Sequence, residues 1–195
     1  MKITARLEGS RLAVDVEHTN PLEEPLYIKH WLLDWYGLLG IPEMNAVTSP
    51  HTARWTPELA FVCIGAPSEV VLFSGDGPEP PLGINVYAPR VPESTRLLPK
   101  QTFRGTVRLP LPLREWHAYD GLDIEPVRPV VVTQLRYRLE TIAESACSRQ
   151  PVRELPNAPG VFRAYGHPVE ILEASVPLPE PITVLQRTDH FERFA

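Results

Sequence analysis

Several features that would reveal a function directly are scarce or missing in this sequence of 195 residues. Its two cysteines, Cys63 and Cys147, are too few for a disulfide framework, so we expect reduced thiols. No apolar stretch approaches the roughly 18 residues of a membrane span. The N-terminal residues also lack the apolar region of a signal peptide. These absences predict a cytoplasmic protein without a membrane partner.

Lysine is scarce as well, because only Lys2, Lys29 and Lys100 are present and the net charge is −5. The charges are spread along the chain without runs of one sign. No broad basic surface for nucleic-acid phosphates is therefore expected, and nucleic acid is excluded as a predicted partner. The excess of arginine over lysine is typical of high-GC bacterial genomes.

Catalytic and cofactor motifs are absent too. The sequence contains no phosphate-binding glycine loop and no nucleophile elbow. Its six histidines are scattered, with none paired at the close spacing of metal ligands. We therefore predict no cofactor, no metal and no catalytic residue. The alternative is a small hydrolase or metal-dependent enzyme whose site assembles from distant residues, with Glu115, His117 and Asp120 as the first suspects.

Proline, in contrast, is abundant. It makes up 23 of 195 residues, or about 12 %, whereas the average protein contains roughly 5 % proline. Proline lacks an amide hydrogen and interrupts long helices and central strands, so short segments joined by turns are expected. Four Trp, six Tyr and six Phe accompany the prolines. Because disordered chains are poor in aromatic residues, this composition favours a folded domain. The prolines fall mainly between the predicted strands.

Period-two alternation of apolar and polar residues predicts the strands. Residues 3–7 and 12–16 form the first pair, joined by a tight turn at Gly9-Ser10. Residues 25–36 also allow a helix, but Pro25 and Gly37 bound them and we expect a strand. The further strands are expected at 59–64, 69–73, 103–109, 131–139, 168–176 and 181–186, with an edge segment at 84–88, loops at 37–57 and 141–160, and a helical turn at 189–195.

Together these segments predict an all-β fold, an antiparallel immunoglobulin-like β-sandwich with long proline-rich loops and few or no helices. Half-polar strands are typical of antiparallel sheets, whereas parallel sheets are buried on both faces. The length fits a single domain over residues 1–195. Its core is expected at about residues 1–140, and residues 141–195 add a loop and C-terminal strands.

Residues 12–140 resemble the N-terminal domain of deuterolysin-type metalloproteases and related bacterial accessory domains. The resemblance rests on the segments at residues 12–20, 25–28, 70–75, 88–92 and 97–109, and on Tyr119. It implies an immunoglobulin-like sandwich that packs against, or regulates, another protein. The protease's zinc motif begins with a His-Glu pair, which this chain lacks, so protease activity is not implied.

Aromatic residues are the best candidates for binding. They form two groups in the sequence, Trp35 and Tyr36 at the end of one predicted strand, and Trp116, His117 and Tyr119 after another. Exposed Trp and Tyr are enriched at interfaces, and binding residues are common on loops. We therefore predict a non-enzymatic binding or protein-interaction module, one that caps or inhibits another protein or associates with itself. An exposed strand edge is a second way to bind.

Overall fold

A computed structural model describes residues 1–34, 54–75, 93–115, 127–147, 151–167 and 169–187. In these ranges the chain is almost entirely β, with one short 3-10 helix, η1 (Glu144–Ala146). The all-β class predicted from the sequence is therefore confirmed. No helix in the described ranges is long and apolar enough to cross a membrane.

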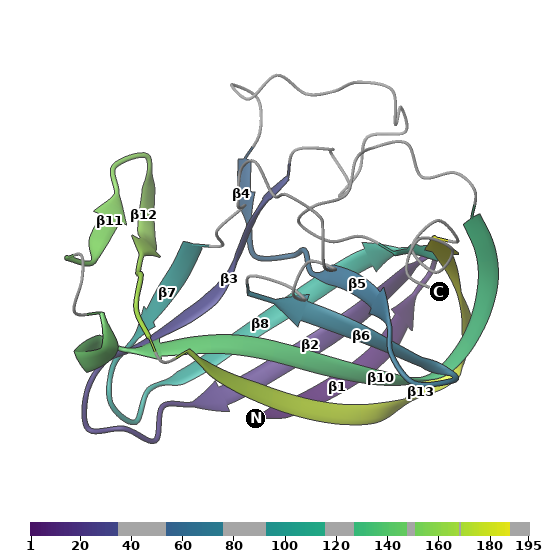
Figure 1. Ribbon diagram of the computed structural model, residues 1–195, viewed down its shortest axis with the longest axis horizontal. Helices are drawn as coiled ribbons and strands as arrows, with labels where there is room; N and C mark the ends of the chain where they lie inside the picture. Colours follow the sequence, from purple (N-terminus) through teal and green to yellow (C-terminus); the bar gives the residue numbers. More distant parts are fainter. Residues whose placement is uncertain (35–53, 76–92, 116–126, 148–150, 168, 188–195) are drawn as a thin grey trace.

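The smaller sheet has three antiparallel strands in the order β1-β2-β8 (Figure 1). They are β1 (Lys2–Glu8), β2 (Arg11–Thr19) and β8 (Thr102–Pro110). β1 and β2 form the predicted hairpin, in which Glu8 pairs with Arg11 across the turn. Gly9 has a φ of 60°, whereas the φ of Ser10 is not positive. This combination is typical of a type II′ turn, which has glycine at its first central position.

Replacing Gly9 should cost stability through the backbone alone. Among the described residues, no atom beyond the chain neighbours of Gly9 lies within 4 Å of the position where a Cβ would be added, so an alanine would meet no neighbour there. An L-residue in the left-handed region nevertheless costs roughly 1–2 kcal/mol. We expect Gly9→Ala to lower the free energy of unfolding by about 1 kcal/mol in urea titrations, with Ser10→Ala near wild type. An unchanged midpoint for Gly9→Ala would contradict this turn.

The larger sheet is built around the long central strand β10 (Val127–Ala143). β13 (Glu170–Arg187) pairs antiparallel along one side. Parallel β6 (Glu69–Ser74) and then antiparallel β3 (Leu26–Asp34) pair along the other. The remaining strands are β4 (Arg54–Thr56), β5 (Phe61–Ile64), β7 (Glu93–Leu97), β9 (Leu113–Arg114), β11 (Arg153–Leu155) and β12 (Ala158–Arg163). The sheet is thus mixed, whereas purely antiparallel pairing was expected.

Prolines lie inside the long strands, which corrects the expectation that they separate strands. Residues 168–176 and 181–186, predicted as two strands, belong mostly to the single strand β13. Val132 pairs with Ile182, but Gln134 pairs with Pro177, so β13 carries extra residues at this point. Such a bulge takes Pro179 and Pro181 out of the regular ladder, where their missing amide hydrogens would be needed.

Several other segments also test the sequence reading. Residues 25–36 contain β3, so the strand expected there is confirmed, and the strands at 59–64, 69–73 and 103–109 match β5, β6 and β8. The loop expected at 141–160 is wrong in large part, because the end of β10, η1, β11 and the first half of β12 lie there. The edge segment at 84–88 and the helical turn at 189–195 fall outside the described residues.

The two sheets share one hydrophobic core. β2 and β8 contribute alternate residues, as expected for strands with one polar face. β6 is buried on both faces, which matches its unbroken apolar run from Val70 to Phe73. The core includes Leu12, Val14 and Val16 of β2, Val107 and Leu109 of β8, Val70 and Leu72 of β6, and Leu135, Tyr137 and Leu139 of β10.

Candidate interaction surface

None of the predicted binding residues belongs to the part of the chain that the structure describes. Trp35, Tyr36, Trp116, His117 and Tyr119 all lie outside the described residues, and so does Asp120. Of the suspects for an enzyme site, only Glu115 is described. It is buried after β9, and its Oε1 accepts a hydrogen bond from the Ile64 amide at 3.4 Å. This carboxylate therefore contacts the backbone at the end of β5.

A polar cluster that the sequence did not reveal lies where β3 meets β7. The pairing of these strands shifts between Lys29 and Trp31, so His30 is an extra residue in the ladder. The Thr95 hydroxyl consequently contacts two rings, His30 Nε2 at 2.8 Å and Trp31 Nε1 at 2.9 Å. The His30 ring also packs edge-on against Phe103, with the ring centroids 4.7 Å apart.

Burial keeps the ionisable rings of the interior neutral. It lowers the pKa of His30 to about 3, because the charged imidazolium would lose its hydration. It raises the pKa of Tyr137 to about 12, despite the hydrogen bond with the Ser74 hydroxyl, which acts the other way. Neither side chain is placed to exchange protons with solvent near pH 7, and both act as neutral parts of the fold.

Two ion pairs with buried members lie in the larger sheet, one buried on both sides and one formed by a buried carboxylate and a partly exposed arginine. Lys29 Nζ is 3.6 Å from Glu140 Oε2, with 4 % and 12 % of the two side chains exposed. Glu93 is buried, and its Oε1 accepts a hydrogen bond from Arg163 Nε at 2.7 Å. That hydrogen bond raises the pKa of Arg163. Each buried charge thus has an opposite charge beside it, as buried charges in a folded interior require.

A small cavity of about 20 Å³ lies beside Glu140. Phe73, Ser74, Arg138, Glu140 and Ile171 line it. This volume holds roughly one water molecule, far less than an organic substrate needs. Within the described ranges, no three His, Cys, Asp or Glu side chains gather as they would around a metal ion. Cys63 and Cys147 are both thiols, as expected from the sequence.

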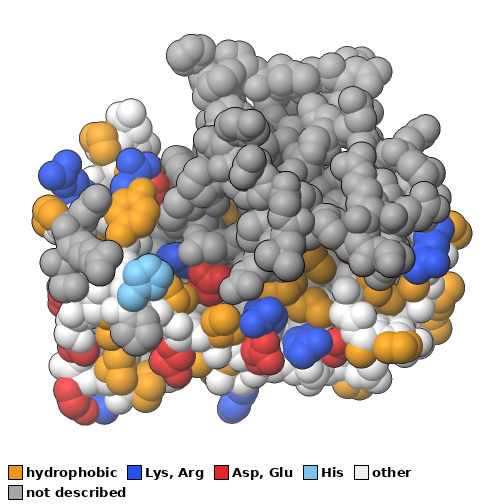
Figure 2. All heavy atoms as spheres, in the orientation of Figure 1, with side chains coloured by type: hydrophobic (Ala, Val, Ile, Leu, Met, Phe, Trp, Pro, Cys, Tyr) orange, Lys and Arg blue, Asp and Glu red, His pale blue; other side chains and the backbone are white. Residues whose placement is uncertain are grey.

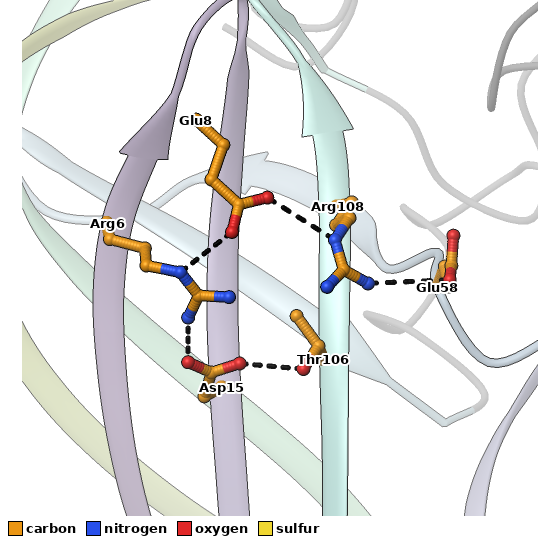
Figure 3. A network of polar contacts seen from close by, with 6 residues as sticks. All are labelled: Arg6, Glu8, Asp15, Glu58, Thr106 and Arg108. Atoms are coloured by element: carbon orange, nitrogen blue, oxygen red, sulfur yellow. Dashed lines mark hydrogen bonds and ion pairs between the residues drawn. The ribbon is translucent and has the colours of Figure 1, made fainter.

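The outer face of the smaller sheet carries an ordered network of charges (Figure 3). Arg6 Nε is 2.8 Å from Glu8 Oε1, and the same guanidinium contacts Asp15. Arg108 lies between Glu8 and Glu58, at 3.4 Å from each. The hydrogen bond from Arg6, assisted by Arg108, lowers the pKa of Glu8. Figure 2 shows the molecule in the orientation of Figure 1. Among the side chains coloured by type in that view, acidic and basic ones are also interspersed.

β1 is an edge strand of this sheet. It pairs with β2 on one side, and no described strand pairs with its other side. Glu8 and Arg11 flank the two-residue turn, so their backbone groups bond each other. By alternation the amide and carbonyl groups of Ile3, Ala5 and Leu7 point away from β2. We call these outward backbone groups the β1 edge. β13 lies against β1 without pairing with it.

Comparison with known proteins adds no relative to this description. No protein-family model matches the chain. No curated protein and no solved structure match it either.

Proposed function

We propose that this chain is a non-enzymatic protein-interaction module that binds through the β1 edge. The observation that carries the proposal is the set of outward amide and carbonyl groups on β1, which no described strand pairs. Such a row is a template on which another chain adds a strand. The inward side chains of β1 pack on the core, which holds the template rigid.

The charged face beside this edge supports selective binding. Arg6 and Glu8 belong to β1 and are fixed by their contacts with Asp15 and Arg108. A partner strand on the β1 edge would lie next to these charges, and complementary charges favour the correct partner over others. The Lys29–Glu140 pair, Glu93 and His30 are largely withdrawn from solvent, and we assign them to stability.

We further propose that the two sheets form an immunoglobulin-like β-sandwich with long proline-rich loops, working in the cytoplasm. The shared core of the two sheets and the two thiols support this reading. The resemblance to the N-terminal domain of deuterolysin-type metalloproteases supports a domain that caps or inhibits another protein. In this proposal the partner is a protein, and neither metal nor cofactor takes part.

A proline at residue 5 separates edge binding from other surfaces. Because the amide of Ala5 points away from β2, Ala5→Pro removes an outward donor and leaves the β1–β2 hydrogen bonds in place. We expect the wild-type chain and Thr4→Ala to retain the same protein from native cells, and Ala5→Pro to lose it. Circular dichroism would verify that both variants fold. Equal retention by Ala5→Pro, or retention of nothing by wild type, contradicts the proposal.

A further inference from the structure

The two terminal charges of β1, which are opposite in sign, lie symmetrically about Ala5. Lys2 lies three residues before Ala5 and Glu8 lies three residues after it, while Ile3 and Leu7 lie two residues to either side. When two copies of such a strand run antiparallel with Ala5 at the centre, each residue meets its mirror position. Lys2 of one copy then faces Glu8 of the other, and Ile3 faces Leu7.

We propose that the β1 edge binds a second copy of this chain, as an antiparallel pair of β1 strands with Ala5 on the twofold axis. This rests on the proposed function and names its partner. The outward groups of Ile3, Ala5 and Leu7 in one copy bond those of Leu7, Ala5 and Ile3 in the other. The two small sheets become one continuous sheet, and two Lys2–Glu8 pairs flank its centre. The interface is self-complementary, as a twofold axis requires.

The neighbouring registers are unfavourable for electrostatic reasons. With Thr4 on the axis, Lys2 of one copy faces Arg6 of the other, so two pairs of like charges form. With Arg6 on the axis, the two Arg6 side chains face each other. Like charges directly opposite one another in a sheet are destabilising. The register centred on Ala5 avoids both arrangements and pairs all seven residues of β1.

Lys2 has the position and the freedom that this pairing needs. Its side chain is exposed and makes no hydrogen bond or ion pair in the part of the chain that the structure describes. Glu8 is also exposed and lies at the far end of the strand, beside Arg6 and Arg108. A lysine from the second copy would extend this chain of alternating charges. The outward-facing charges would also exclude an edge strand of different charge pattern.

Two charge reversals test the register. Lys2→Glu places acid opposite acid in its homodimer, and Glu8→Lys places lysine opposite lysine. Mixed one to one, however, the two variants restore both opposite-charge pairs. In sedimentation-velocity runs on purified chain, up to about 1 mM, we expect wild type to dimerise. Each variant alone should bind about tenfold more weakly, and the mixture should return to the wild-type affinity.

Two further measurements separate the possible failures. Ala5→Pro should be monomeric under the same conditions, and Thr4→Ala should dimerise like wild type. A wild-type chain that stays monomeric throughout would overturn the self-pairing, while retention of a different protein through the β1 edge would still support the proposed function. A wild-type dimer that is unaffected by Ala5→Pro, or a mixture no tighter than its components, would place the dimer contact elsewhere and overturn the proposal.

Discussion

Replacing Lys29 by Met should lower the free energy of unfolding by about 3–5 kcal/mol, because it leaves the Glu140 carboxylate buried beside an uncharged side chain. The two residues are cross-strand partners in β3 and β10, and both side chains are largely withdrawn from solvent. In such a place the attraction of the opposite charge offsets most of the cost of dehydration. Urea unfolding at neutral pH, followed by tryptophan fluorescence, would measure the loss.

A second change should recover most of this stability. With Glu140→Gln added to Lys29→Met, neither charge remains, and we expect unfolding within about 1–2 kcal/mol of wild type. The matched control is Lys100→Met, which removes a cation paired with Glu23 in an exposed setting. Exposed pairs contribute at most about 1 kcal/mol. If Lys29→Met lowers the free energy of unfolding no more than Lys100→Met does, the Lys29–Glu140 pair is not buried, which would contradict the structure.

Acidification from pH 7.5 to pH 5 should cost the protein about 2 kcal/mol of stability through His30 alone. The pKa of this ring is about 3 in the fold and near 6.5 in the unfolded chain. Between these values only the unfolded state takes up the proton. Stability from His30 is therefore complete above about pH 6.5, and it falls steadily as the pH drops toward 3.

His30→Gln removes this proton uptake and keeps a polar group beside Thr95. We expect the variant to be less stable at pH 7.5, yet to lose about 2 kcal/mol less than wild type on going to pH 5. His167→Gln, at an exposed position, serves as the control and should keep the wild-type pH dependence. If the free energy of unfolding falls equally with pH in His30→Gln and in wild type, the His30 ring is not held neutral by burial.

The sequence predicted those strands whose burial pattern is local. In β1, β2 and β8 one face is apolar and the other polar, and this pattern depends only on neighbouring residues. β7 escaped prediction because its Glu93 and Ser94 are polar and yet buried between β3 and β12. β9 and β11 are only two and three residues long, so no period could be read from them.

The surface features were harder to predict than the strands. The residues of β1 and their charges are plain in the sequence, but an edge is defined by which strands pair, and that depends on distant parts of the chain. The bulge at His30 is likewise set by the pairing of β3 with β7. The aromatic prediction, at Trp35, Tyr36, Trp116, His117 and Tyr119, lies outside the described residues and stays a prediction.

The exposure of the β1 edge can be measured directly by amide hydrogen exchange in dilute protein, followed residue by residue by NMR. The amides of Thr4, Arg6 and Glu8 point toward β2 and should exchange slowly. Those of Ile3, Ala5 and Leu7 point outward and should exchange quickly, then slow as the protein is concentrated. An alternating pattern of this kind is the expected result. Slow exchange of all six amides in dilute monomer would show that the edge is already covered, and would contradict binding through β1.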